Sequence, residues 1–158
     1  MEPSKNFIDT GEDERWMRRA LAEAQLAAAE EEVPLGCIIV DGEGRIVGKA
    51  HNQTECLHDA TAHAEMVALS QAFAAVGNER LVDCTLYVTK EPCPMCAGAI
   101  ALARLKRVVW GVGDEKRGGE SVFGIFRHQG MNHHPETQGG VLAAPSLAIL
   151  QDFFRRRR

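Results

Sequence analysis

The sequence predicts a layered α/β protein, because segments with strand character alternate along the chain with segments with helix character. Thr85–Thr89 and Arg107–Gly111 are rich in β-branched and aromatic residues, as strands are. Pro94–Ala103 lies between them and consists mostly of small residues, which predicts a helix. His63–Val76 predicts another helix, because its apolar residues follow helical spacing and Gly77 stands at its end.

Two further elements are expected before this alternating region. Apolar side chains recur at helical spacing from Asp13 to Glu31, and Pro34 ends that helix. The apolar runs Leu35–Val40 and Arg45–Ala50 are separated by turn residues at 41–44, which predicts a hairpin of two strands. These segments extend the alternation of helices and strands toward the N-terminus.

Length and composition indicate a single domain spanning residues 1–158. A chain of 158 residues with 45% hydrophobic side chains can bury one continuous core, and no repeat or linker divides it. The Gly-rich region 111–140 lacks a long periodic pattern, so we expect a functional loop with short elements at most. Pro145 is expected to open a last helix, at about 145–157.

Charge and terminal sequence narrow the classes of function. The formal net charge of −4 argues against a uniformly basic nucleic-acid coat, although positive side chains gather at 104–107, at 116–117 and at 155–158. Residues 1–14 lack the features of a secretory or transit signal, and charges interrupt every apolar run. We therefore expect a cytoplasmic protein with no membrane span. Five cysteines, an odd number, favour thiols or metal ligands over a disulfide framework.

The strongest motif is His63-Ala64-Glu65 combined with the segment PCPMC at 92–96. His63, Cys93 and Cys96 supply three ligands, which is too few for a closed structural zinc site and suits a catalytic site with an open fourth position. Thiolate and imidazole ligands favour zinc over magnesium or calcium, and they leave iron or another transition metal possible.

The spacing of this motif constrains where it lies. Residues at i and i+2 of a helix diverge by about 200°, so His63 and Glu65 can serve one site only at a helix start. The segment Asp59–Thr61 offers capping residues for that helix, and Pro94 suits the first turn of the helix that carries the cysteines. Two helix starts would meet at the metal, and their positive ends would favour thiolates.

This arrangement predicts a deaminase. Glu65 stands beside the metal ligands without being one, so it can take a proton from a metal-activated water and deliver it to a ring nitrogen and the departing amine. Attack on an amidine-like carbon then yields a carbonyl and ammonia. A lone C-x-x-C is often structural or redox-active, and a lone H-x-E is usually a helix surface, but the combination is typical of deaminases.

Beyond this motif, the chain resembles the bacterial tRNA-specific adenosine deaminases, in the cytidine-deaminase-like superfamily, over almost its whole length. The resemblance implies a three-layer α/β/α fold with a mixed sheet of about five strands, and a homodimer with one zinc ion per subunit. It also implies conversion of adenosine to inosine at the wobble position of a tRNA anticodon stem-loop. The segments that carry it are EVPLG (32–36), DATAHAEMVAL (59–69), TLYVTKEPCPMCAGAI (85–100), RVVWGVGDEK (107–116), GMNH (130–133) and DFFR (152–155).

The same resemblance implies substrate contacts. Asn52 stands where the family has an asparagine that contacts the flipped base, Asp114 matches an acid that contacts the anticodon loop, and Asn132 matches a further loop position. From the residues alone, each is equally an ordinary turn or loop residue. Phe153 and Arg155 suit stacking on splayed bases and contact with phosphates, or else the phenylalanines pack the last helix and the arginines are solvated.

Two other functions compete with this interpretation. A deaminase of free guanine, cytosine or cytidine would need an enclosed pocket without a basic rim, and a catalytically silent zinc scaffold would have no use for Glu65. The remaining cysteines are expected to be small packing residues, and the remaining histidines to be surface or supporting residues rather than ligands. These residues are Cys37, Cys56, Cys84, His51, His58, His128, His133 and His134.

Overall fold

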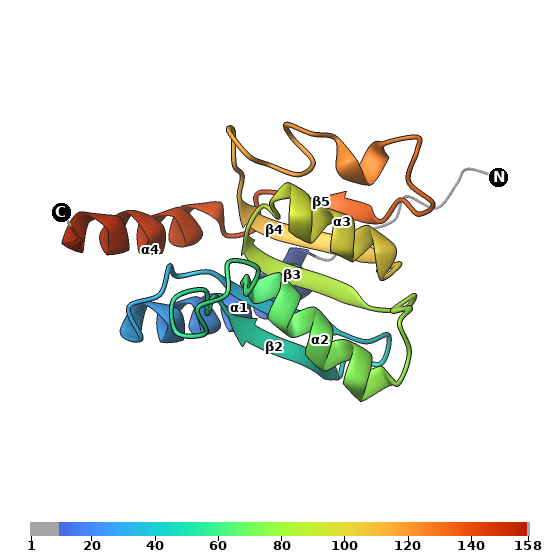
Figure 1. Ribbon diagram of the computed structural model, residues 1–158, viewed down its shortest axis with the longest axis horizontal. Coiled ribbons are helices and arrows are strands. Elements are labelled where there is room, and N and C mark those ends of the chain that lie inside the picture. Colours follow the sequence, from blue (N-terminus) through green and yellow to red (C-terminus); the bar gives the residue numbers. More distant parts are fainter. Residues whose placement is uncertain (1–9, 158) are drawn as a thin grey trace.

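The computed structural model describes residues 10–157 (Figure 1). Residues 1–9, which contain most of the segment expected to lack a targeting signal, and Arg158 of the arginine run lie outside the described residues. The elements are α1 (Thr10–Ala29), β1 (Gly36–Val40), β2 (Ile46–His51), α2 (Ala64–Val76), β3 (Thr85–Lys90), α3 (Pro94–Leu102), β4 (Arg107–Val112), the short 3-10 helix η1 (Ile125–Arg127), β5 (Glu136–Gln138) and α4 (Ala143–Arg156).

The strands form one mixed sheet in the order β2-β1-β3-β4-β5. β1 pairs antiparallel with β2 and with β3, whereas β3–β4 and β4–β5 are parallel. The predicted hairpin is confirmed, and Asp41 stabilises its turn by accepting hydrogen bonds from the backbone N–H groups of Glu43 and Arg45 at 3.0 and 2.9 Å. The expected mixed sheet of five strands is therefore confirmed.

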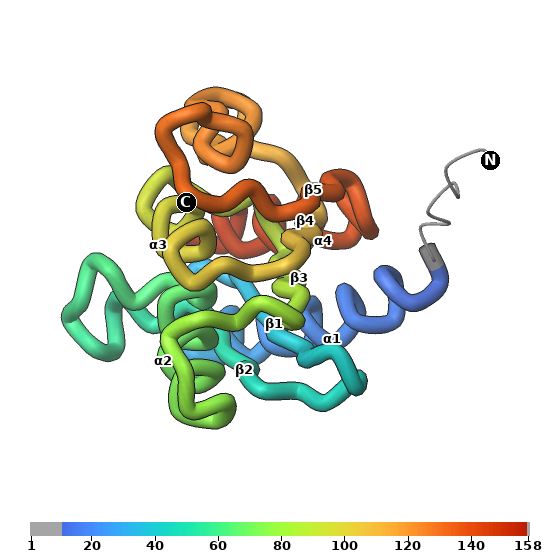
Figure 2. The backbone as a smooth tube through the Cα atoms, turned by 90° about the vertical axis from the view of Figure 1, so that its right-hand side faces the viewer, coloured from blue at the N-terminus to red at the C-terminus, as the bar shows by residue number. Residues whose placement is uncertain are grey.

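Helices cover both faces of the sheet, which confirms the three-layer architecture. In Figure 2, α2 and α3 lie on one side of the strands and α1 and α4 on the other. The core is divided accordingly: one apolar cluster joins α2 and α3 to the sheet, and a second joins α1 to the opposite face. Gly48 of β2 allows close packing of α2, because a Cβ atom there would lie 2.5 Å from the carbonyl oxygen of Ala68.

The start of α1 is tied to the middle of the chain. Asp13 is buried and accepts hydrogen bonds from the guanidinium of Arg107, with 2.7 Å between Arg107 Nη2 and Asp13 Oδ2. Tyr87 donates its hydroxyl proton to the same carboxylate at 3.2 Å. Arg107, grouped with two other basic residues in the sequence, therefore has a structural partner.

The last helix begins earlier than predicted. α4 begins at Ala143 rather than at Pro145, because the chain enters the helix through Leu142 in a left-handed conformation, with φ of 52°. The region 111–140 contains only short elements, η1 and β5, as expected. Among the described residues, no helix is both long and apolar enough to cross a membrane.

Candidate metal and catalytic site

His63 and Glu65 lie at the start of α2, as their spacing predicted. His63 is the N-cap residue, with extended backbone angles of φ −67° and ψ 153°, and Glu65 is the second residue of the helix. The expectation that Asp59–Thr61 caps this helix is wrong, because Asp59 instead accepts hydrogen bonds from the N–H and hydroxyl of Thr61 within the preceding turn. The extended N-cap backbone lets the His63 and Glu65 side chains point to a common side of the helix end.

Cys93 and Cys96 lie at the start of α3. Cys93 is the N-cap residue, with φ −69° and ψ 171°, and Pro94 occupies the first turn, where its missing N–H costs no helical hydrogen bond. Cys96 is fully buried and Cys93 partly so. The two cysteines therefore share one side of a helix start that faces the start of α2.

The three ligand atoms have the spacing of a tetrahedral zinc site. The Sγ atoms of Cys93 and Cys96 lie 3.6 and 3.5 Å from Nδ1 of His63, and all three atoms lie within 4.8 Å of one another. With Zn–S of about 2.3 Å and Zn–N of about 2.1 Å, sulfur and nitrogen ligands of tetrahedral zinc are about 3.6 Å apart. Within residues 10–157, this is the single group of three or more His, Cys, Asp or Glu side chains with metal-binding geometry.

Burial and short-range contacts set the acid–base properties of these groups. Glu65 is 4% exposed, and burial raises the pKa of its carboxyl group. The hydrogen bond from Cys96 lowers the pKa of Cys93 to about 4 and raises the pKa of Cys96. Cys93 is thus the more readily ionised of the two thiols, while burial makes Glu65 hold its proton more tightly than an exposed glutamate does.

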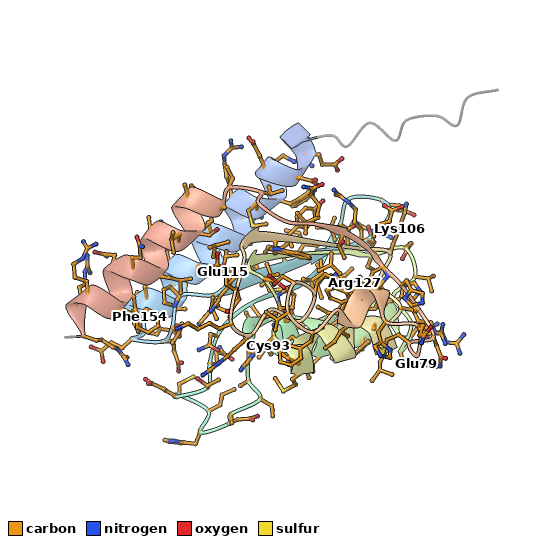
Figure 3. All side chains as sticks on the ribbon, turned by 90° about the horizontal axis from the view of Figure 1, so that it is seen from above. Glu79, Cys93, Lys106, Glu115, Arg127 and Phe154 are labelled. Carbon is orange, nitrogen blue, oxygen red and sulfur yellow. The ribbon has the colours of Figure 1, made fainter. Side chains whose placement is uncertain are left out.

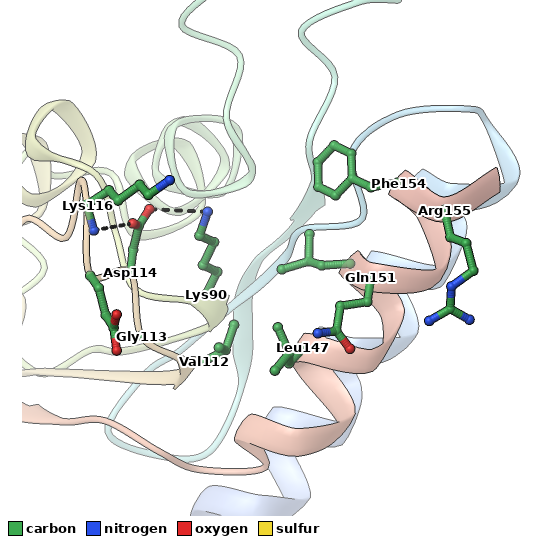
Figure 4. A pocket seen from close by; sticks show the side chains of 11 residues that line it. Lys90, Val112, Gly113, Asp114, Lys116, Leu147, Gln151, Phe154 and Arg155 are labelled. Carbon is green, nitrogen blue, oxygen red and sulfur yellow. Dashed lines mark hydrogen bonds and ion pairs between the residues drawn. The ribbon is translucent and has the colours of Figure 1, made fainter. Parts of the chain in front are cut away.

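The site lies at the carboxyl ends of β3 and β4, where ligands bind in open α/β sheets. A cavity of about 150 Å³ there contains His63, Glu65 and Cys93, and is also lined by residues of both strand ends, including Lys90, Glu91 and Asp114. A larger open groove of about 680 Å³ shares Lys90 and Asp114 with this cavity and extends along α4 (Figure 4). The catalytic cavity and the groove are therefore neighbours with a common wall.

The chain is similar to known deaminases. The family model of MafB19-like deaminases matches residues 11–158. A tRNA-specific adenosine deaminase of Streptococcus pyogenes is 44% identical, over 90% of this chain and 90% of that protein. A tRNA-specific adenosine deaminase of Haemophilus influenzae is 45% identical, over 92% of this chain and 85% of that protein. The chain belongs to the family of tRNA-specific adenosine deaminases.

A solved structure supports the same family assignment at the level of the fold. It comes from studies of A-to-I editing by tRNA deaminases at the wobble position of transfer RNA. Its TM-score to this chain is 0.82 at 41% identity, and the match covers 86% of this chain and 99% of that one. The cytidine-deaminase-like α/β fold that the family resemblance implies is thus confirmed.

Of the residues that family resemblance assigns to the substrate, Asp114 lines the deaminase cavity. Asn52 contacts a lining residue, because its backbone N–H donates to the carbonyl oxygen of Leu35 at 3.0 Å. Asn52 directly follows β2 and is buried, with its side-chain nitrogen 3.4 Å from both Glu32 Oε2 and Thr54 Oγ1. Asp114 follows β4 and lines both the cavity and the groove. Its carboxylate accepts backbone hydrogen bonds from Lys116 and Arg117, and these bonds lower its pKa although partial burial acts to raise it.

Asn132 lies apart from the other candidates. It borders a hollow of about 170 Å³ that also includes Leu102 and Arg104, at the C-terminal end of α3, whereas the metal ligands lie at the N-terminal end of that helix. Figure 3 shows Cys93, at the start of α3, well apart from Lys106, which lies between the end of that helix and β4. Within one chain, Asn132 therefore does not reach the catalytic cavity.

The phenylalanines and arginines of α4 have different surroundings. Phe153 is 8% exposed and its ring lies under the guanidinium of Arg157, 4.5 Å from the ring centre, so it packs within the fold. Phe154 is 48% exposed and lines the groove together with Arg155. Arg157 also pairs with Glu55 at 3.4 Å. Of the described arginines 155–157, Arg155 is thus the one that lines the groove.

Two buried acids near the candidate substrate residues were not predicted from the sequence. Glu32 is 1% exposed and accepts hydrogen bonds from the backbone N–H groups of Glu55 and Cys56. Glu91 is 4% exposed and accepts hydrogen bonds from Asp114, Glu120 and Ser121. The available signal was a glutamate placed directly against an apolar or proline-containing segment, in EVPLG and TKEPC, where a surface charge is not expected.

The remaining cysteines and histidines mostly follow expectation. Cys37 and Cys84 are buried packing residues, whereas the same prediction for Cys56 is wrong, because its thiol lies on the exposed loop after β2. His51 is nearly buried and bonds Glu30 at 2.8 Å, which is a supporting role rather than a metal ligand. His133 and His134 make ring-nitrogen contacts to backbone carbonyl oxygens, at 2.6 and 2.9 Å.

Proposed function

We propose that this chain converts adenosine to inosine at the wobble position of a tRNA anticodon, with one zinc ion per subunit held by His63, Cys93 and Cys96. The observation that carries the proposal is the buried Glu65 beside three ligands whose spacing fits a tetrahedral zinc with one position free. A structural zinc site needs four protein ligands and no neighbouring acid, so this geometry favours catalysis over a silent scaffold.

Glu65 moves the proton in this reaction. Zinc in such a site acidifies a water molecule and so supplies the nucleophile near neutral pH. The Glu65 carboxylate would accept one proton of the water and deliver it to the purine ring nitrogen, and would then carry the second proton, from the new hydroxyl group on the ring carbon, to the amine, which leaves as ammonia when the C–N bond breaks. The raised pKa of Glu65 suits a group that must both take and return a proton.

The size of the cavity supports a base that has left its stack. At about 150 Å³, the cavity is smaller than the roughly 300–1,000 Å³ typical of sites for drug-sized ligands. A single base fits this description better than a folded RNA, so the target nucleotide must flip into the site. In this proposal Asn52, whose backbone donates to the lining residue Leu35, hydrogen-bonds that base through its side chain.

The groove supports an RNA substrate over a free base. The alternative, a deaminase of free guanine, cytosine or cytidine, would call for an enclosed pocket without a basic rim. Here the cavity borders an open groove whose lining includes Lys116, Phe154 and Arg155. Arginine and lysine suit phosphates, and an exposed aromatic ring suits an unstacked base. In this proposal Phe154 offers the aromatic face, because Phe153 is covered by Arg157.

We further propose a homodimer in a reducing, cytoplasmic compartment. α3 exposes Met95 and Leu102 to 36% and 77%, and the loop before η1 exposes Val122 and Phe123. These apolar side chains suit a subunit interface. Asn132 adjoins Leu102, so in a dimer it would serve at the interface rather than at the cavity of its own chain. All five cysteines are free, as a reducing compartment requires.

The test is inosine formation in an anticodon stem-loop, run beside free adenosine, cytidine and guanine with the zinc-loaded full chain. The proposal expects product from the stem-loop alone and none from the Glu65→Ala variant. Activity on a free base or nucleoside alone would keep the chemistry and overturn the tRNA substrate. Inactivity on every substrate, with zinc bound, would favour the scaffold.

A further inference from the structure

The carboxylate of Glu91 holds the loop that follows β4. It accepts backbone hydrogen bonds from Asp114 at 3.1 Å, Glu120 at 3.2 Å and Ser121 at 2.8 Å, and the Ser121 hydroxyl donates to it at 2.8 Å. A buried charge is costly unless it is hydrogen-bonded, and these donors provide that compensation. One side chain thus joins both ends of the loop 114–121.

Lys90 and Glu91 hold Asp114 from two directions. Successive residues at the end of a strand point to opposite sides. The ammonium of Lys90 pairs with the Asp114 carboxylate at 3.2 Å, while Glu91 accepts the backbone N–H of the same residue. Figure 4 shows the Asp114 carboxylate between Lys90 and the backbone of Lys116. Both the side chain and the backbone of Asp114 are therefore fixed.

The loop also packs tightly on the segment that carries the metal ligands. The N–H of Gly119 donates to the carbonyl oxygen of Pro92 at 2.8 Å. A Cβ atom at Gly119 would lie 2.7 Å from Cβ of Ala97 and 2.8 Å from that carbonyl oxygen, so no other residue fits without movement. Because Gly119 is fixed in this way, the loop cannot shift as a whole to restore the position of Asp114 if its hydrogen bonds to Glu91 are lost.

We propose that Glu91 is a positioning residue that sets substrate affinity by keeping Asp114 at the shared wall of the cavity and the groove. It acts through Asp114 rather than on the reacting atoms. The inference rests on the proposed RNA substrate, and on the contact between Asp114 and the anticodon loop that the family resemblance implies. A glutamine at position 91 would turn an NH₂ group toward N–H donors and so lose part of this network.

Glu32 provides a matched comparison within the same chain. It is buried like Glu91 and accepts backbone N–H groups of a different loop, from Glu55 at 3.2 Å and Cys56 at 2.6 Å. Glu91→Gln should therefore accelerate amide hydrogen exchange at Asp114, Glu120 and Ser121 and leave Glu55 and Cys56 unchanged, and Glu32→Gln should do the reverse.

The affinity test is a double-mutant cycle on the zinc-loaded chain. Every variant carries Glu65→Ala, so that the dissociation constant of an anticodon stem-loop is measured without turnover. We expect Glu91→Gln to weaken binding by about tenfold, the size expected for losing hydrogen bonds to a charged group. In the Asp114→Asn background the same change should cost less than about twofold, because its effect passes through Asp114.

Each other outcome overturns a specific claim. If Glu91→Gln weakened stem-loop binding as much in the Asp114→Asn background as in the parent, the positioning role of Glu91 would be rejected. Faster amide exchange in the loop with an unchanged dissociation constant would reject it as well. An Asp114→Asn variant with unchanged affinity would reject the RNA contact itself, and no stem-loop binding by the parent would reject the proposed function. If Glu91→Gln does not fold, Ser121→Ala removes one donor from an exposed position and enters the same cycle with a smaller expected loss.

Discussion

The metal centre and its rim are built in different ways. All three ligands and Glu65 lie in or beside the first turns of two helices, and their positions depend on helix starts that short motifs specify. Asn52, Asp114 and Arg155 come from the ends of β2 and β4 and from α4, and buried acids hold the first two in place. The comparison teaches that the catalytic groups are positioned by local geometry, whereas the residues proposed to contact the substrate are positioned by contacts between distant segments.

The largest expected effect comes from removing a metal ligand. Cys96→Ser replaces a thiolate by a hydroxyl that binds zinc poorly, so zinc content should fall well below one per chain and inosine formation should drop to background. Elemental analysis and the stem-loop assay measure both. Cys56→Ser, at an exposed cysteine, is the matched control and should change neither. Full zinc loading and activity in Cys96→Ser would reject this ligand set.

The next effect separates proton transfer from metal binding. Glu65→Gln keeps the size of the side chain and removes its acid–base function, so kcat should fall by about 10²–10⁴-fold while KM for the stem-loop and zinc content stay near the parent values. Steady-state kinetics and metal analysis check this. Glu43→Gln in the exposed hairpin turn is the control. A higher KM with an unchanged kcat would show that Glu65 acts in substrate binding rather than in proton transfer.

At the rim, neighbouring arginines should differ. Arg155 lines the groove, so Arg155→Ala should raise KM several-fold and lower the salt dependence of stem-loop binding by about one phosphate contact. Arg157 pairs with Glu55 and donates to the Glu31 carbonyl, so Arg157→Ala should mainly reduce stability, by less than about 1 kcal/mol. Binding at several salt concentrations and thermal unfolding distinguish the two. If Arg155→Ala and Arg157→Ala lowered the salt dependence of stem-loop binding equally, the assignment of Arg155 alone to the RNA would be rejected.

The smallest expected effect concerns pH. Backbone hydrogen bonds hold the pKa of Asp114 below its usual value, so its carboxylate stays ionised when pH falls from 8 to 5.5. The ratio of stem-loop affinities between the parent and Asp114→Asn should therefore be the same at both pH values. A ratio that shrinks at pH 5.5 would mean that Asp114 is protonated there and is held less firmly than the structure indicates.

The same contrast explains what could be predicted from the sequence. His63, Glu65 and the cysteines were predictable, because their spacing and the prolines at 92 and 94 require helix starts. Phe153 and Phe154 could not be separated, since both fit the apolar face of a helix whose rotation depends on its contact with the sheet. Glu32 and Glu91 were missed because they accept hydrogen bonds from backbone groups 23–30 positions away, and such bonds leave no sequence pattern.

The bond between Asp13 and Arg107 bears on how the chain leaves the ribosome. These residues are 94 positions apart, so the N-terminal helix, although synthesised first, cannot complete its docking until β4 has emerged. Until then, the apolar side of α1 with Trp16, Met17 and Ala20 lacks part of its final cover. A nascent chain truncated before Arg107 would expose this surface, and such fragments should be frequent clients of chaperones and proteases.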